Sequence, residues 1–312
     1  MTAFFIALAA VVSLLLVAVP GYLMLRFRLV GEDCIPGISK ILVFVCQPCL
    51  AIYTFKSTPF SVETLCRMGI FTLLVLGINV FMLGISFLIL RKKSKEPVYR
   101  IMTIATTFGN CAFFGIPIIE ALLPGQASDL VLYTTIYAFV MNVLGWTVGS
   151  AIIAQDCRHI SLKKIFLNPA MLGTAFALLL FVLEVPIQED LLSMITICGR
   201  MASPLSMLVM GMRLATCNLR QVVTSVQAYI AIFVKQCIMP LVALAIVWFL
   251  PIDISMKQTF YIICACPVAS IVLNYSEIVG AGQRDGATMV LLGTGLSIVT
   301  LPLMMLLLPL IA

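Results

Sequence analysis

Long apolar stretches alternate with short polar breaks along all 312 residues of the chain. A helix crosses a lipid bilayer with about 20 mostly apolar residues. Ten stretches meet this requirement, and the fourth and ninth carry proline and polar residues in their interiors. The ten ranges are 2–25, 36–56, 66–90, 99–123, 129–154, 166–184, 190–213, 222–250, 256–281 and 286–311. We therefore predict an all-α, polytopic membrane protein with ten transmembrane helices.

The composition supports a lipid environment. Hydrophobic residues make up 62% of the chain and charged residues 10%, whereas a soluble domain carries roughly 25% charged residues. The chain therefore has too few charged groups to cover a water-facing surface. The formal net charge of +6 does not indicate a nucleic-acid partner, because the basic residues lie mainly in the breaks between apolar stretches.

The basic residues predict an orientation instead. Fourteen of the 19 lie in the breaks that follow odd-numbered stretches, Arg213 at the end of the seventh among them, and three follow even-numbered stretches. The break with the most basic residues holds Arg91, Lys92, Lys93, Lys95 and Arg100. Cytoplasmic loops carry an excess of Lys and Arg. We predict a multi-pass protein of the cell (inner) membrane, with the odd-numbered breaks in the cytoplasm and both termini outside.

Ten spans divide into two halves of five, residues 1–154 and 155–312, and an odd number of spans per half forces the halves into opposite orientations. The fourth span contains Gly109 to Pro117, and the ninth contains Pro267 between Cys264 and Ser270. Proline and glycine both weaken a helix. Interrupted spans at matching places in two inverted halves indicate a transporter binding site. We therefore predict an inverted repeat with its site at these two spans.

The same residues carry a family resemblance along the whole chain. The motifs, in order, are Pro20-Gly21-Tyr22, Gly109-Asn110 with Gly115-Ile116-Pro117, Asn168-Pro169, Ser203-Pro204-Leu205 with Gly211 and Leu214, Pro267, and Thr300-Leu301-Pro302. Together they resemble the auxin efflux carrier family, the bacterial relatives of PIN-type auxin exporters. This chain departs from the plant exporters in the short break between its fifth and sixth spans.

The resemblance implies a fold shared with bile-acid symporters and sodium/proton antiporters. In that fold the interrupted fourth and ninth helices cross at their prolines. Spans 1, 2, 6 and 7 form a scaffold, and spans 3–5 and 8–10 form a transport domain that moves against it, in an elevator-type motion with alternating access. The resemblance also implies a small organic anion as substrate, either an auxin-like acid or a carboxylate such as malate or malonate. We further expect a homodimer, with a proton or a sodium ion as a possible coupling ion.

Five residues are candidates for substrate binding: Asn110, Pro117, Asn142, Pro267 and Arg200. The resemblance places the substrate contact of the fourth span on Asn110, and a contact of the fifth span on Asn142 or on Met141. Arg200 lies mid-span, where a charge is costly and suggests function. It either attracts the anion or has a structural role, as a partner of Glu277 or of carbonyl groups or as a snorkelling side chain.

Three other ionisable residues are open at this stage. For Lys235, also mid-span, a structural role is favoured. Glu120 and Glu277 lie near the ends of their spans and are either proton sites or interfacial residues.

Rival functions have weaker support in the sequence. We predict no metal and no cofactor: Cys46 and Cys49 form a C-x-x-C pair inside an apolar stretch without a nearby histidine. An intramembrane enzyme needs a membrane-embedded histidine or aspartate, but His159 and all six aspartates fall in breaks or at span ends, so we predict that the chain is not an enzyme. A cation/proton antiporter on the same fold would require aspartates in mid-membrane. A ligand-binding sensor would require an output domain.

Overall fold

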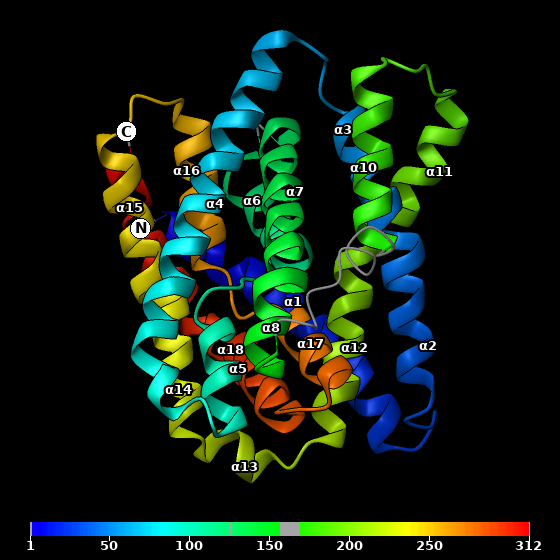
Figure 1. Ribbon diagram of the computed structural model, residues 1–312. Helices are drawn as coiled ribbons and strands as arrows, with labels where there is room; N and C mark the ends of the chain where they lie inside the picture. Colours follow the sequence, from blue (N-terminus) through cyan, green and yellow to red (C-terminus); the bar gives the residue numbers. More distant parts are fainter. Residues whose placement is uncertain (1, 125–126, 157–168, 312) are drawn as a thin grey trace.

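The computed structural model describes residues 2–124, 127–156 and 169–311, and every regular element within these ranges is a helix. Seven helices of the described part are long and apolar enough to cross a membrane. They span Thr2–Arg26, Cys34–Lys56, Val62–Lys93, Asp129–Ala154, Glu189–Thr216, Val226–Phe249 and Gln283–Leu310. The prediction of an all-helical, multi-pass membrane protein is confirmed by the type, length and apolar composition of these helices (Figure 1).

Most of these seven helices consist of shorter segments, including π-helical and 3₁₀ turns labelled η. In chain order they are α1 (Thr2–Arg26), α2 (Cys34–Ile41), η1 (Leu42–Cys46), α3 (Gln47–Lys56), α4 (Val62–Leu90), η2 (Arg91–Lys93), α7 (Ala127–Leu144), η5 (Gly145–Gly149), α8 (Ser150–Ala154), α11 (Glu189–Arg200), α12 (Ala202–Thr216), α14 (Val226–Phe233), η7 (Val234–Ile238), α15 (Met239–Phe249), α18 (Gln283–Met305) and η8 (Leu308–Leu310).

The other three predicted spans are shorter pieces. The fourth consists of α5 (Pro97–Ala105), η3 (Cys111–Gly115) and α6 (Ile116–Leu122); the described part of the sixth is α10 (Pro169–Val182); and the ninth consists of α16 (Ile254–Ala265) and α17 (Ile271–Val279). The count of ten spans therefore stays a prediction. His159, Asn168 and three basic residues used for the orientation, Arg158, Lys163 and Lys164, lie outside the described residues.

Three prolines inside the spans follow π-helical turns. The segments η1, η3 and η7 each end two residues before a proline, namely Pro48, Pro117 and Pro240, and each of these prolines lies in the first turn of the helix that follows. A proline has no N–H to bond the carbonyl four residues earlier. The residue before it therefore donates to the carbonyl five residues back, as Ile116 does to Cys111. The helix consequently passes through Pro117 without a break.

The expected break near Pro117 is therefore misplaced. The fourth span is interrupted at residues 106–110, and the ninth at residues 266–270 as predicted around Pro267. The two interruptions pair in a short antiparallel bridge between Gly109 and Val268. The backbone N–H of Asn110 donates to the carbonyl of Pro267 at 2.7 Å, and that of Ala269 donates to the carbonyl of Phe108 at 2.9 Å. We call this paired region the crossing.

The predicted start of the eighth span is also wrong. A separate short helix, α13 (Leu219–Thr224), precedes α14, and the chain between them is extended at Ser225. The side chains of Asn218 and Ser225 accept hydrogen bonds from the backbone N–H groups of Arg220 and Ala228. Two helix N-termini are capped in this way within eight residues. The two caps divide a segment that the sequence pattern predicts as one apolar span.

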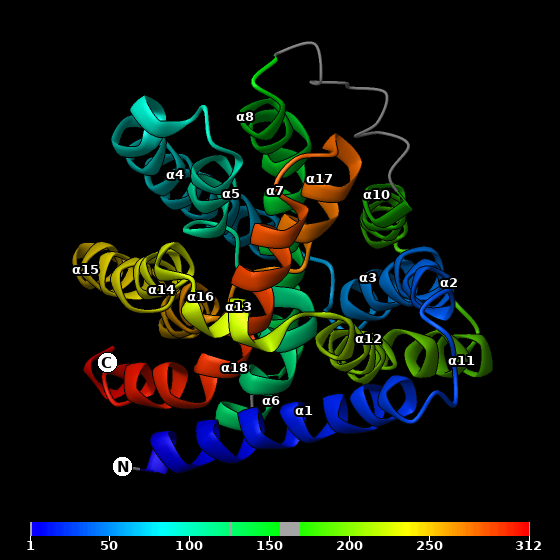
Figure 2. The same ribbon diagram turned by 90° about the horizontal axis from the view of Figure 1, so that it is seen from below.

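The helices pack in two groups. The first group contains α1, α2, α3, α10, α11 and α12: α1 packs along α12, and α3 packs against both α10 and α11. The second group contains α4 to α8 and α14 to α18, in which α18 contacts α5 and α14, and α7 contacts α4 and α16. Helix α1 crosses one side of the molecule and also touches α6 and α18 of the second group (Figure 2).

Helices α1 and α12 meet at two glycines. A Cβ atom added at Gly211 would lie 1.8 Å from the carbonyl oxygen of Ala18, and one added at Gly21 would lie 2.1 Å from that of Leu208. Both distances are far below van der Waals contact. Small residues allow helix backbones in membranes to approach closely, and packing then supplies the association energy. The contact between α1 and α12 therefore depends on glycine on both sides.

Candidate functional site

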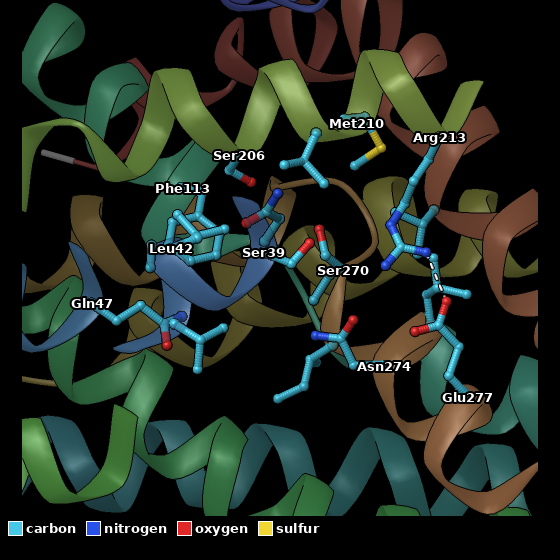
Figure 3. A pocket seen from close by; sticks show the side chains of 18 of the residues that line it. Ser39, Leu42, Gln47, Phe113, Ser206, Met210, Arg213, Ser270, Asn274 and Glu277 are labelled. Carbon is cyan, nitrogen blue, oxygen red and sulfur yellow. Dashed lines mark hydrogen bonds and ion pairs between the residues drawn. The ribbon is translucent and has the colours of Figure 1, made fainter. Parts of the chain in front are cut away.

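A cavity of about 890 Å³ lies between the two groups of helices. Residues of α2, η1 and α12 line it from the first group, and residues of η3, α7, α17 and α18 line it from the second (Figure 3). Two sets of lining residues follow helical spacing. Ser206, Met210 and Arg213 lie on α12, and Asn274 and Glu277 lie on α17, which Ser270 precedes. Residues four and three apart share one helix face, so one face of each helix contributes to the cavity wall.

The crossing brings two helix N-termini to this cavity. Asn110 precedes η3, Ser270 precedes α17, and both residues line the cavity with the residues that follow them. Neither side chain caps its own helix. The first N–H groups of a helix lack intrahelical partners, and the helix dipole makes that end electropositive. The wall at the crossing therefore favours an anion.

Asn110 has a donor without an acceptor. Its side chain is 3% exposed, and its amide nitrogen Nδ2 is buried without a hydrogen-bond partner among the described residues. Its backbone is fully used, because the carbonyl accepts from Gly115 and the N–H donates to Pro267. A buried donor left unpaired costs about 1–3 kcal/mol. A bound acceptor group would remove this penalty.

Trp146 of η5 also lines the cavity, and its indole Nε1 is likewise buried without a partner. Its ring packs edge to face against Tyr275 of α17, with the centroids 4.9 Å apart. An indole nitrogen only donates. Two N–H donors at one cavity therefore lack acceptors. Sequence reasoning missed Trp146, because an unsatisfied donor is a property of the folded chain.

The structure also places Asn142 and Met141, the two alternatives for the fifth span, in the cavity lining. The side-chain nitrogen of Asn142 already donates to the carbonyl of Ala138, one turn back, at 2.8 Å. Asn142 is therefore less available as a donor than Asn110.

Pro117, Pro267 and Arg200 do not line the cavity. Pro267 supplies the carbonyl that Asn110 contacts in the crossing. Arg200 lies at the end of α11, where its Nη2 donates to the Tyr53 hydroxyl at 2.9 Å. The hydrogen-bond partner of Arg200 is thus a tyrosine and not Glu277, the partner expected from the sequence, because Glu277 pairs with Arg213 instead.

Lys235 lies at the crossing, beside the C-terminal end of α16. It is fully buried, and its Nζ donates to the carbonyl of Cys264, in the last turn of α16, at 2.7 Å. A Cβ atom added at Gly109 would lie 2.9 Å from the same Nζ. A helix C-terminus is electronegative, so the ammonium occupies a favourable position. Its contacts agree with the structural role favoured for it.

An ion pair joins the two walls of the cavity. Nη1 of Arg213 on α12 lies 2.7 Å from Oε1 of Glu277 on α17, and both residues line the cavity (Figure 3). From the sequence, Arg213 was assigned to a break and was given no role at the site. A basic residue at the end of an apolar stretch normally indicates membrane orientation, so its position in the cavity lining was not predicted.

Comparison with known proteins supports a transport function. Residues 6–160 and 154–305 match the family described as membrane transport protein, so the match covers almost the whole chain. A search of curated proteins found no match. The chain belongs to the membrane transport protein family, which includes carriers of the auxin efflux type.

Proposed function

We propose that this transporter is a carrier of the auxin efflux type that moves a small organic anion with a carboxylate group by alternating access. The observation that carries the proposal is that two residues lining one cavity, Asn110 and Trp146, each hold a buried N–H donor with no acceptor in the part of the chain that the structure describes. A carboxylate accepts hydrogen bonds at two oxygens. A carboxylate in the cavity therefore offers acceptors to such donors, which a cation cannot do.

The helix termini support the same substrate class. Two half-helices begin at the cavity wall, and their dipoles stabilise a negative charge there without a full positive charge. The cavity volume of about 890 Å³ lies in the usual range of roughly 300–1,000 Å³ for small-molecule sites. Asn110 is the residue we assign to the carboxylate, with Asn142 and Trp146 completing the wall.

The two groups of helices support an elevator-type motion. The cavity lies between them, and the crossing belongs entirely to the second group. We propose that the first group is the scaffold and that the second group carries the substrate. The ten spans and the inverted repeat of residues 1–154 and 155–312, both expected from the apolar stretches, belong to the same proposal, together with a homodimer.

The proposal includes transport without sodium. The carbonyl end of a half-helix would hold a coupling cation, and here the ammonium of Lys235 already binds the carbonyl of Cys264. Nζ of Lys235 therefore occupies the helix end that a bound cation would take.

We expect proteoliposomes containing the purified protein to take up a labelled carboxylate, and we expect the rate to be unchanged when sodium is replaced by choline. The panel should contain indole-3-acetate, malate, malonate and the neutral indole-3-acetamide. Empty liposomes and the neutral amide are the controls. Uptake of no carboxylate in the panel, with or without a pH gradient, would contradict the proposed function, and uptake only in sodium would contradict the role given to Lys235.

The orientation has a separate test. The cavity is lined near its rim by Glu32 and Lys40, two exposed residues beside a basic break, so on the predicted topology it opens to the cytoplasm. We expect an epitope inserted at Ser94 to be protected in intact spheroplasts and an epitope at either terminus to be accessible. Accessibility at Ser94 and protection at the C-terminus would reverse the assignment.

A further inference from the structure

The ion pair between Arg213 and Glu277 differs from the ion pair between Arg67 and Glu63. Arg67 and Glu63 lie one turn apart on the surface of α4, and their contact is local. Arg213 and Glu277 are 64 positions apart and join α12 of the first group to α17 of the second. In the proposed motion α17 moves against α12. This contact would therefore have to open in every transport cycle.

The pair is suited to opening. The side chains of Arg213 and Glu277 remain 24% and 41% exposed. Ion pairs with this access to water contribute little to stability, because solvent screens the attraction and two long side chains lose freedom. Such a contact is a weak structural link. A second carboxylate that enters the cavity can therefore replace Glu277 at little cost.

The guanidinium has capacity for another acceptor. It carries five N–H donors in a planar fork that matches a carboxylate, and the contact with Glu277 uses Nη1. Arg213 also shares the cavity with Asn110. Side chains of a helix lean toward its N-terminus, so Glu277 leans toward Ser270 at the crossing. The cationic group and the helix N-termini thus border one continuous space.

We propose that Arg213 selects dicarboxylates: it binds the second carboxylate of the substrate, and Glu277 is an internal competitor that holds the guanidinium until the substrate displaces it. This inference rests on the proposed function and names its substrate class. One carboxylate lies at the crossing with Asn110, and the other replaces the Glu277 carboxylate on Arg213. A monocarboxylate makes only the first contact and leaves the ion pair closed.

The test compares two ligands that differ by one carboxylate. Malate and 2-hydroxybutyrate share a chain and a hydroxyl, but a methyl group replaces one carboxylate in the second. Calorimetry on the purified full chain in nanodiscs measures the affinity of each ligand. The parent protein should prefer malate by at least about tenfold, the effect of one hydrogen-bonded charge contact.

The variants then separate the two partners. Arg213→Gln should weaken malate binding by about tenfold and leave 2-hydroxybutyrate within twofold. Glu277→Gln removes the competitor and should tighten malate binding by up to about fivefold, the worth of an exposed ion pair. The double variant should bind malate like Arg213→Gln alone, because Glu277 acts only through Arg213. Lys40→Gln, at the exposed rim of the same cavity, is the matched control and should change neither affinity by more than twofold.

The outcomes distinguish this inference from the proposed function. Equal affinity of the parent for both ligands, or transport of indole-3-acetate without malate binding, overturns the role of Arg213 and leaves carboxylate transport intact. Weaker malate binding in Glu277→Gln shows that the ion pair holds the site together, which also overturns it. An equal effect of Lys40→Gln and Arg213→Gln assigns the preference to the general potential of the cavity and overturns the specific contact.

Discussion

Replacing Asn110 by alanine is expected to weaken carboxylate binding by about 10- to 150-fold. The substitution removes the buried Nδ2 donor, which has no hydrogen-bond partner among the described residues. A hydrogen bond to a charged group contributes about 1.5–3 kcal/mol, which corresponds to this range of affinity. Stability should change in the opposite direction, because the variant no longer buries an unpaired donor. Calorimetry and thermal unfolding on the same preparation measure both effects.

Two further variants sharpen this prediction. Asn110→Asp keeps the shape of the side chain and places a carboxylate beside the substrate's own, so binding should fall below detection. Asn142→Ala is the matched control at the same cavity: its side-chain nitrogen already bonds the carbonyl of Ala138, and the loss should stay within about threefold, since a net neutral hydrogen bond contributes about 0.5–1.5 kcal/mol. Parent-like binding by Asn110→Ala would place the anion site away from the crossing.

Replacing Gly211 by leucine is expected to prevent stable folding of the protein. The new Cβ would meet the carbonyl oxygen of Ala18 at 1.8 Å, and this backbone atom cannot move aside as a flexible side chain would. Helices α1 and α12 must separate along their whole contact. Overpacking of cores costs typically 1–3 kcal/mol, and we expect the upper end of this range or more. The readout is the midpoint of thermal unfolding in detergent, together with the monodisperse fraction on gel filtration.

Gly295 of α18 supplies the control for this prediction. A Cβ atom added there meets no atom within 4 Å, so Gly295→Leu introduces the same side chain in open space. Because glycine is a poor helix former, this variant should be as stable as the parent or slightly more stable. Equal stability of Gly211→Leu and Gly295→Leu would mean that α1 and α12 do not meet as described.

The sequence alone predicts that the protein is all-helical. It predicts the interruption of the ninth span but misplaces that of the fourth. Apolar length is a local property, so most spans are found within a few residues of their observed limits. The break was expected near Pro117, but a proline in the first turn of a helix destabilises the helix little. The actual break at Gly109 depends on a partner segment around Val268, more than 150 residues away. A single sequence does not display that pairing.

The candidate site shows the same limit. Asn110 and Asn142 were predicted, the first from its place in the interrupted span and both through the family resemblance, and both line the cavity. Arg213 and Trp146 were missed for different reasons. Arg213 stands at the end of an apolar stretch, where a basic residue normally reports orientation. Trp146 matters because its indole N–H has no acceptor, and hydrogen-bond satisfaction exists only in the folded chain.

The crossing has a consequence for how substrate preference evolves. It is held by backbone hydrogen bonds between residues 108–110 and 267–269, so most side-chain replacements there leave the half-helix ends in place. The opposite wall on α12 is built from side chains on an ordinary helix face. Mutation can therefore remodel that wall while the half-helix ends persist. Engineering a new substrate specificity should begin at Ser206, Met210 and Arg213, where substitutions can be selected without unfolding the protein.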